Sequence, residues 1–417
     1  MKSLPVVLLL LFVRSTLFAA DPIVVSDSDW PWWRGPTRDG KALAGQKVPV
    51  RFGPQQNVIW KVSVNGRGHG SPTVVGNTIF LSAADEVKRT QSVIAFERRT
   101  GKQRWETVVN RGAFPEKIHR NNTHASATIG SDGKRAFVIF YNNNGIQLAA
   151  LNFDGSVLWE KQAGTFFPQK YEFGYGASPL IHGDHVIVAA DYEKGGFLAA
   201  FDRNTGREAW RSKRKAMTNY ASPVVATIAG KEQILLGGNM SVNGYDLASG
   251  NELWSAPGPS KATCASLVTD GVLIFSSGGF PEKFTVAVNS SGQEVWRNNQ
   301  KSYEQSMLWH DGFLYTITDA GIAYCWRGND GKEMWRQRLK GPVSASPVLV
   351  GDVIYQCNEK GTFFVFKANP ERFELLSENQ VGESSFATLS VCGGRIYVRV
   401  AVGSGGTREE MLYCFGE

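Results

Sequence analysis

Side chains that could bind a ligand or a metal recur at regular intervals along this 417-residue sequence. Each lies two positions before a serine or threonine that begins an apolar stretch, and the series reads His69, His124, Gly176, Tyr220, Cys264, Glu304, Ser344 and Phe386. Imidazole and carboxylate groups are common metal ligands, and His69, His124 and Glu304 supply them here. No zinc-type ligand spacing accompanies them, so we expect no metal.

Two long segments between predicted strands bring further side chains to the same region. Residues 110–124 contain Arg120, Asn121 and Asn122, and residues 160–175 contain the aromatics Phe166, Phe167, Tyr171, Phe173 and Tyr175. Rings beside amides and a guanidinium suit a planar, anionic or sugar-like ligand. Alternatively, the aromatics seal a small core of their own. The candidate ligand-binding residues are His69, Arg120, Asn121, His124, Tyr175, Tyr220 and Glu304.

The sequence contains no recognisable catalytic motif. It has no Ser-His-Asp order, no HExxH, no phosphate-binding glycine loop and no paired-carboxylate motif. The sequence therefore assigns no catalytic residue, and whether the protein is an enzyme stays open, with a non-catalytic role favoured.

An internal repeat indicates which elements position these side chains. Units such as FDRNTGREAW, which ends at Trp210, each end in a tryptophan after a tight turn. The tryptophans are Trp60, Trp105, Trp159, Trp210, Trp254, Trp296 and Trp335. Their spacing is that of a four-stranded propeller blade. Each indole offers about 150–250 Å² of surface and is expected to wedge between neighbouring blades.

The repeat predicts an all-β, eight-bladed β-propeller of four-stranded blades. Eight starts are present, and each reads as a strand, a Gly/Asp/Asn turn and a second alternating strand. The unit that begins at Phe386 has only three strands, and the unit that ends near Leu376 lacks a tryptophan. The missing strand is residues 57–64, so an N-terminal strand completes the C-terminal blade, closes the ring and removes open sheet edges.

The N-terminus is predicted to carry a signal peptide over residues 1–20. Lys2 precedes an apolar run at residues 4–13, and small residues permit cleavage after Ala19 or Ala20. The run is too short to span a bilayer. Residues 21–56 form a lacing segment whose tryptophans, Trp30, Trp32 and Trp33, should cover the outside of the first and last blades, and residues 57–417 form the propeller. We expect a soluble exported monomer, periplasmic or extracellular, that does not span the membrane.

Charge and cysteine usage narrow the function. The net charge of +7 is not gathered in a nucleic-acid module, so we expect no nucleic-acid partner. The cysteines are Cys264, Cys325, Cys357, Cys392 and Cys414. Their odd number leaves at least one thiol unpaired. We interpret them as buried strand residues. A disulfide between Cys392 and Cys414 is possible, and the sequence does not decide whether it forms.

Two units carry a docking motif that is found in a known family. Residues 200–210, AFDRNTGREAW, match the Ala-x-Asp-x-x-Thr-Gly-x-x-x-Trp motif of quinoprotein-like propellers, and residues 95–105 match it with Glu97 for Asp. From about Asp29 onward the chain resembles the PQQ-like repeat proteins, which include the outer-membrane assembly protein BamB and exported planctomycete propellers with a WRGPxRDG opening. Quinoprotein alcohol dehydrogenases, which are similar in fold, use adjacent cysteines, calcium ligands and a catalytic Asp.

The departures from this family decide among the functions that the resemblance implies. The sequence has no adjacent cysteines, and it lacks the N-terminal lipid-anchor cysteine of BamB. We therefore expect no cofactor and a non-catalytic binding or scaffold module, which presents its loop face to a protein partner or envelope ligand, with outer-membrane protein assembly as the implied role. The alternatives are an oxidoreductase that uses PQQ with calcium, and a glycan or small-molecule binder at the channel mouth.

Overall fold

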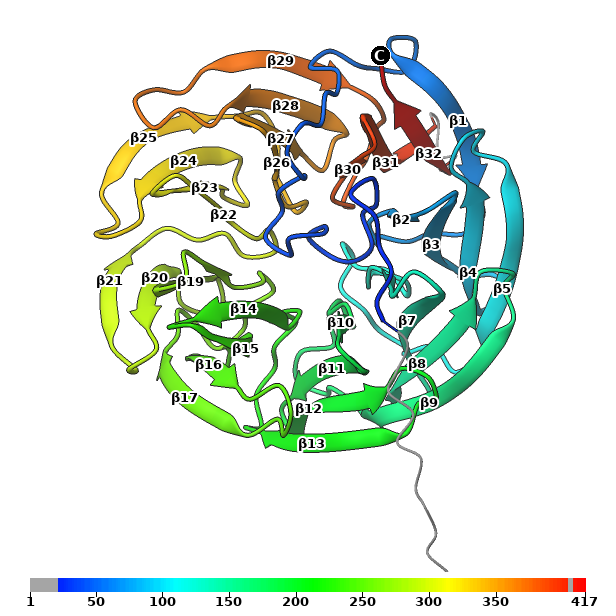
Figure 1. Ribbon diagram of the computed structural model, residues 1–417, viewed down its shortest axis with the longest axis horizontal. Coiled ribbons are helices and arrows are strands. Elements are labelled where there is room, and N and C mark those ends of the chain that lie inside the picture. The colour runs from blue at the N-terminus through cyan, green and yellow to red at the C-terminus, as the bar shows by residue number, and fades with distance from the viewer. Residues whose placement is uncertain (1–21, 404–407) are drawn as a thin grey trace, which may run out of the picture.

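A computed structural model describes residues 22–403 and 408–417, so the predicted signal peptide lies outside the described residues. These residues form eight four-stranded antiparallel sheets arranged as blades around a central channel (Figure 1). The prediction of an eight-bladed all-β propeller is confirmed. None of the described residues forms a helix with the length and apolar character that a membrane span requires.

The first four blades follow one another along the chain, each from the innermost to the outermost strand. Blade 1 contains β2 (Thr73–Val75), β3 (Thr78–Asp85), β4 (Thr90–Glu97) and β5 (Gln103–Arg111). Blade 2 contains β6 (Gly130–Ser131), β7 (Arg135–Asn142), β8 (Gly145–Asn152) and β9 (Val157–Thr165). Blade 3 contains β10 (Leu180–His182), β11 (His185–Tyr192), β12 (Gly195–Asp202) and β13 (Glu208–Arg214). Blade 4 contains β14 (Val224–Ile228), β15 (Lys231–Gly238), β16 (Ser241–Tyr245) and β17 (Glu252–Pro257).

The remaining blades repeat this order until the last one. Blade 5 contains β18 (Val268–Thr269), β19 (Leu273–Gly278), β20 (Phe284–Asn289) and β21 (Glu294–Asn298). Blade 6 contains β22 (Leu308–His310), β23 (Phe313–Ile317), β24 (Ile322–Arg327) and β25 (Glu333–Arg338). Blade 7 contains β26 (Val348–Val350), β27 (Val353–Cys357), β28 (Thr362–Lys367) and β29 (Leu375–Gln380). Blade 8 contains β30 (Ser390–Cys392), β31 (Arg395–Val402), β32 (Glu409–Phe415) and, as its outer strand, β1 (Val58–Val64).

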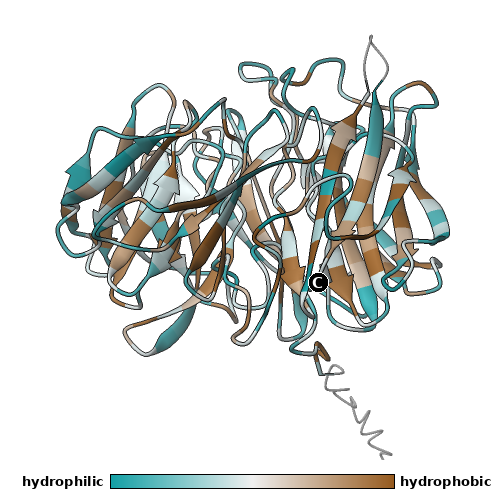
Figure 2. Cartoon of the chain, turned by 90° about the horizontal axis from the view of Figure 1, so that it is seen from above, coloured by the Kyte–Doolittle hydropathy of each residue, from teal (hydrophilic) through white to brown (hydrophobic). Residues whose placement is uncertain are grey.

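Strand β1 closes the ring as predicted. It pairs antiparallel with β32, and Trp60 lies opposite Cys414. The middle strands of each blade are apolar and buried on both faces, whereas the outer strands alternate exposed and covered residues, as in Glu208–Arg214. Figure 2 shows the disc edge-on, with apolar residues concentrated along the strands. The core is therefore the set of interfaces between successive blades.

Five of the seven repeat tryptophans donate an indole hydrogen bond to the next blade, whereas the Trp254 indole bonds to Gln233 of its own blade. The indole Nε1 of Trp159 in blade 2 donates to the carbonyl of Arg203 in blade 3 at 3.2 Å. A Cβ on the turn residue Gly206, whose φ is +69°, would lie 2.7 Å from the Trp159 ring. The turn thus needs glycine twice, for its left-handed backbone and for the close approach of the indole. The indoles of Trp60, Trp105, Trp296 and Trp335 donate to backbone carbonyls of the following blade in the same way.

Blade 7 replaces its missing tryptophan with a residue from the N-terminal segment. Ser377 occupies the tryptophan position, because it pairs with Val365 as Trp105 pairs with Ala95. Phe52 is 2% exposed, and its ring centroid lies 4.9 Å from that of Phe415 in blade 8. The Ser377 hydroxyl donates to the carbonyl of Val50 at 2.6 Å. The segment therefore supplies the aromatic wedge between blades 7 and 8.

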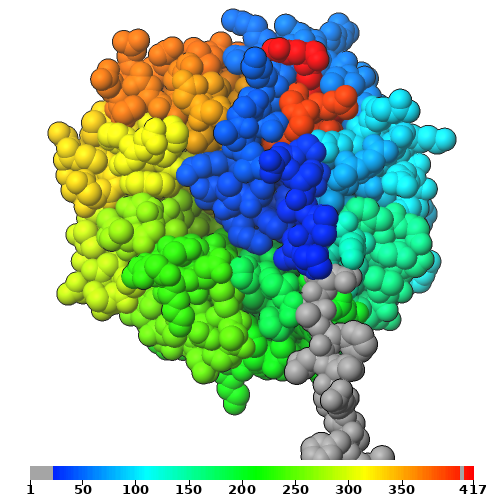
Figure 3. All heavy atoms as spheres, in the orientation of Figure 1, coloured from blue at the N-terminus to red at the C-terminus, as the bar shows by residue number. Residues whose placement is uncertain are grey.

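The rest of the N-terminal segment crosses the central opening, which corrects our prediction that it covers the outside of the first and last blades. Figure 3 shows it lying over the middle of one face. Trp30 forms a β-bridge with Val74 of blade 1. The buried Arg34 guanidinium donates to the carbonyls of Met307 and Pro347 at 2.6 and 3.0 Å. Met307 and Pro347 directly precede the innermost strands β22 and β26, and arginine can satisfy several acceptors at once. The segment therefore closes one end of the channel, and we call it the plug segment.

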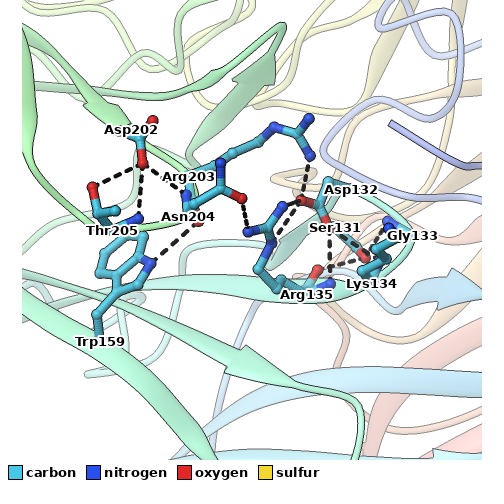
Figure 4. Close-up of polar contacts among 10 residues, drawn as sticks. All are labelled: Ser131, Asp132, Gly133, Lys134, Arg135, Trp159, Asp202, Arg203, Asn204 and Thr205. Carbon is cyan, nitrogen blue, oxygen red and sulfur yellow. Dashed lines mark hydrogen bonds and ion pairs between the residues drawn. The ribbon is translucent and has the colours of Figure 1, made fainter. Parts of the chain in front are cut away.

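A buried ionic cluster joins blades 2 and 3 on the same face. The Asp132 carboxylate lies between the guanidinium groups of Arg135 and Arg203, at 2.7 and 2.6 Å (Figure 4). The Asp132 side chain is fully buried. The carbonyl of Asp132 also accepts a hydrogen bond from the amide of Val24 in the N-terminal segment at 2.9 Å. This cluster fixes the relative position of two blades and the plug segment.

Candidate functional site

The candidate site is a cavity of about 390 Å³ where the innermost strands begin. One hydroxyl residue per blade lies beside it, in a ring of Ser71, Thr128, Ser178, Ser222, Ser266, Ser306, Ser346 and Thr388. Four of these line the cavity itself: Thr128, Ser178, Ser222 and Thr388. At six of the eight junctions the backbone amide of one member donates to the hydroxyl of the next, as Ser178 does to Ser222 at 2.8 Å. The same bond joins Ser71 to Thr128 and Ser346 to Thr388 across other blade junctions. The repeat serine therefore links neighbouring blades and fixes the cavity wall.

Trp33 closes the inner end of this cavity. Its indole Nε1 donates to the Ser266 hydroxyl at 2.9 Å, and its ring lines the cavity. The sequence pattern favoured a packing role for this tryptophan on the outside of the ring over a ligand-binding role. It was missed because nothing in the opening segment specifies which part of the ring the segment contacts.

Four of the predicted site residues line the cavity: His69, Asn121, Tyr220 and Glu304. They share its wall with Gly176, Cys264, Ser344 and Phe386, which were also placed at the channel mouth by the repeat. His119, Phe280 and Tyr303 line it too and were not predicted. Tyr303 lies directly before Glu304, and Phe280 lies in the loop between β19 and β20. Alignment of the blade loops could have identified both.

His124 is not a member of the ring, which corrects its predicted position. Thr128 is the ring residue of blade 2, because its hydroxyl accepts from the amide of Ser71, and it lies two residues before β6. The equivalent of His69 is therefore Ser126, which lines the cavity. His124 packs on Phe114 instead, with ring centroids 4.4 Å apart. The His124 side chain therefore does not join the candidate residues that line the cavity.

Arg120 and Tyr175 also lie outside the cavity. Arg120 is exposed on its loop. Tyr175 is buried, and its hydroxyl donates to the carbonyl of Ala189 at 2.8 Å. Its ring meets that of the fully buried Phe166, with centroids 5.5 Å apart. Part of this aromatic loop thus seals its own core, whereas Phe173 lines the cavity.

The two long loops support each other beside the cavity. The Asn122 side chain donates to the carbonyl of Phe173 at 2.6 Å, and the ring of His119 packs edge-on against that of Phe173. Lys117 and Glu172 form an ion pair at 3.6 Å near the loop tips. These contacts hold the two loops together as one rim over blades 2 and 3.

The electrostatics of the cavity differ between its two sides. Burial, together with Arg67 and Arg399, holds the pKa of His69 well below its usual value, so His69 is neutral. Its ring stacks on Phe386 with centroids 4.5 Å apart. On the other side, burial raises the pKa of Glu304, and the nearby carboxylates of Glu359 and Asp319 add to this effect.

Metal and PQQ chemistry can be compared with the donor set of this cavity. Within the described residues, no group of three or more His, Cys, Asp or Glu side chains is arranged to hold a metal ion. PQQ carries several carboxylates, which require cationic partners and a metal bridge. The described lining contains no lysine or arginine, and Glu304 is its one carboxylate. The residues present do not fit PQQ with calcium.

All five cysteines lie among the described residues and are free thiols. Cys392 and Cys414, for which the sequence left a disulfide undecided, are therefore not bonded to each other. Four are buried, and Cys264 is the only one partly exposed. Cys264 lines the cavity.

We therefore expect iodoacetamide to alkylate one thiol of the native protein, and Cys264→Ser to abolish this labelling. The reaction should be slow at neutral pH and accelerate with rising pH, because burial raises the pKa of Cys264 and only the thiolate reacts. Intact-mass spectrometry, with a urea-unfolded sample as the fully labelled control, measures this result. Labelling of two or more native thiols, or unchanged labelling of the Cys264→Ser variant, would contradict it.

The fold, the docking tryptophans and the walled channel define a PQQ-like repeat propeller. The family model described as outer membrane protein assembly factor BamB matches residues 54–114, 89–273 and 282–372. The chain therefore belongs to the BamB family.

Individual relatives agree with this assignment. The chain is 24% identical over 377 residues to the outer membrane protein assembly factor BamB of Burkholderia pseudomallei, and the match covers 77% of this chain and 92% of that protein. The crystal structure of BamB from Moraxella catarrhalis is 14% identical with a TM-score of 0.60, over 86% of this chain and 97% of that chain. A europium-containing methanol dehydrogenase is 12% identical with a TM-score of 0.67, over 94% and 98%. At these sequence identities, each of the two solved structures is similar to this chain in fold alone.

Proposed function

We propose that this protein is an exported, non-catalytic propeller that binds a protein partner during the assembly of outer-membrane proteins. The observation that carries the proposal is its membership of the BamB family, supported by a relative that it matches over 92% of that relative's length. The architecture supports a binding role, because each blade is docked on its neighbours and the ring is closed by β1. Such a platform holds its loops in fixed positions.

The loop face around the cavity is the surface that we propose for the partner. Large apolar side chains are exposed on its loops: Val87, Phe167, Met240 and Phe280. They lie in the loops of this face that join β3 to β4, β9 to β10, β15 to β16, and β19 to β20. Exposed apolar residues rimmed by polar loops are typical of protein-binding surfaces. The opposite face is occupied at its centre by the N-terminal segment.

The donor set of the cavity favours this proposal over a quinone-dependent oxidoreductase. PQQ with calcium would need cationic and metal-ligating side chains, and the described lining offers one carboxylate and no lysine or arginine. The sequence also lacks the adjacent cysteines that the dehydrogenases use.

Gene deletion in the host organism, followed by complementation, tests the proposal. We expect deletion to lower the amount of folded outer-membrane proteins severalfold, as measured by heat-modifiable mobility on gels. The intact chain should restore it. A variant with Val87→Ser, Phe167→Ser and Met240→Ser should fail, because partner contact at the loop face is lost.

A matched variant with Val157→Ser and Leu158→Ser changes exposed apolar residues on the outer rim instead and should complement fully. Both variants must accumulate in the envelope at the level of the intact chain. Unchanged outer-membrane proteins after deletion would refute the assembly role. Full complementation by the loop-face variant would refute the proposed surface.

A further inference from the structure

We propose that the channel-mouth cavity is a binding site for an organic cation, meaning a protonated or quaternary nitrogen attached to apolar groups. This inference goes beyond the assembly role and does not depend on it, because it concerns the interior of the cavity and not the outer loop surface. Three features of the cavity carry it: its aromatic wall, its unpaired carboxylate and the absence of lining cations.

Aromatic rings from several blades and from the plug segment form much of the wall: Trp33, Phe173, Tyr220, Phe280, Tyr303 and Phe386. The centroids of Phe173 and Tyr220 lie 6.2 Å apart, and Phe173 is held in place by Asn122 and His119. The face of an aromatic ring attracts a cation, and several rings around one space are the usual site for quaternary or protonated amines.

Glu304 supplies a negative charge beside these rings. Lys301 is the cation that acts on the Glu304 carboxylate, but its ammonium group pairs with Asp319 at 2.7 Å. Among the described residues, Glu304 forms no ion pair with a lysine, arginine or histidine. Its side chain is near the neutral Ser344 hydroxyl, which stabilises the carboxylate slightly and also donates to Glu359 at 2.7 Å. A half-buried carboxylate without a counter-ion is unfavourable. A bound cation would compensate for that cost.

The opposite side of the cavity adds no positive charge. His69 is neutral, and its buried Nε2 atom has no hydrogen-bond partner among the described residues. Neither lysine nor arginine occurs in the described lining. An anion would therefore meet a carboxylate without any compensating cation, whereas a cation meets rings, hydroxyl groups and a carboxylate.

The size of the cavity sets the size of the ligand. A volume of about 390 Å³ lies at the small end of the range for small-molecule sites. It suits an amine that carries one aromatic ring, or the side chain of a lysine. A free amine and a lysine of a partner protein present the same chemistry to Glu304, so the experiment must distinguish them.

Calorimetric titration of the mature chain with 2-phenylethylamine tests the site, with 2-phenylethanol and phenylacetate as neutral and anionic counterparts. We expect the amine to bind at least about tenfold more tightly than either counterpart. Glu304→Gln, which keeps the shape of the side chain, should weaken amine binding about tenfold. The matched control Glu294→Gln changes an exposed carboxylate on β21 that pairs with Arg297, and it should bind the amine as the intact chain does.

Two further readouts complete the test. Saturating amine should slow the alkylation of Cys264, which lines the same cavity. A short acetylated peptide amide with one lysine between two phenylalanines, compared with its norleucine analogue, identifies the source of the cation. Preference for the lysine peptide without binding of the free amine assigns the site to a partner's side chain, and binding of the free amine assigns it to a small molecule.

Two results would overturn the proposal. One is that neither the amine nor the lysine peptide binds more tightly than its neutral counterpart. The other is that a Glu304→Gln variant with an unchanged melting temperature binds the amine as tightly as the intact chain. Neither result would bear on the assembly role, which is tested by complementation with loop-face variants.

Discussion

Removal of residues 21–64 is expected to convert the folded protein into an aggregating chain. This deletion removes β1, so blade 8 keeps three strands and exposes the unpaired edge of β32. It also removes Trp60, which is 9% exposed, and Phe52, which is 2% exposed. Burial of one tryptophan contributes about 4–6 kcal/mol, which is comparable with the whole stability of a typical domain.

Size-exclusion chromatography with light scattering, together with a thermal melt, measures this effect. A chain that lacks only residues 1–20 is the matched control and should remain monomeric with a cooperative melt. A stable monomer without residues 21–64 would contradict closure of the ring by β1.

Substitution of Asp132 by asparagine is expected to destabilise the protein by about 3–5 kcal/mol, the second-largest effect that we predict. The change leaves the shape of the side chain but removes the charge between Arg135 and Arg203, whose guanidinium groups are then buried without a counter-ion. A lowered urea midpoint and a lowered melting temperature would report this. Asp330→Asn, in the exposed pair with Arg327, is the matched control and should change neither value appreciably.

The stability that Asp132 contributes should depend on pH, in a direction that follows from the shift of its pKa. Burial alone would raise the pKa of Asp132, but hydrogen bonds from Arg203 and from the amides of Lys134 and Arg135 lower it below the usual 3.8. A lowered pKa in the folded state stabilises the protein above the unfolded pKa, and this stabilisation is lost as the pH falls through the folded pKa. The difference between the intact chain and Asp132→Asn should therefore narrow below about pH 3.8. A difference that stays constant down to pH 2 would contradict it.

The sequence predicts the fold well because most units carry a tryptophan, and the ring of that tryptophan meets a turn glycine of the next unit. Trp159 and Gly206 belong to different units, and only the repeat of both signals shows that successive units dock. The replacement at blade 7 could not be predicted in the same way. The loss of the tryptophan there is visible locally, but Phe52, which fills the space, lies near the other end of the chain.

The site was predicted in part, and the errors have physical causes. In blade 2, Ser126 and Thr128 are both hydroxyl residues two positions apart, so the pattern alone could not decide which one belongs to the ring. The hydrogen bond from Ser71 to Thr128 decides it, and such a bond is not visible in the sequence. The plug segment was placed wrongly because its arginines bind backbone carbonyls, which every blade provides.

The pairing of β1 with β32 also determines when the protein can finish folding. Val58 leaves the ribosome, or emerges from an export channel, long before its partner Phe415 does. Blade 8 and the wedge of Phe52 therefore form only after the last strand has appeared. Until then, both ends of the unfinished ring expose apolar strand surface over the full time of synthesis or export, and contacts of such high sequence separation form slowly. The chain thus needs protection from aggregation before its ring closes.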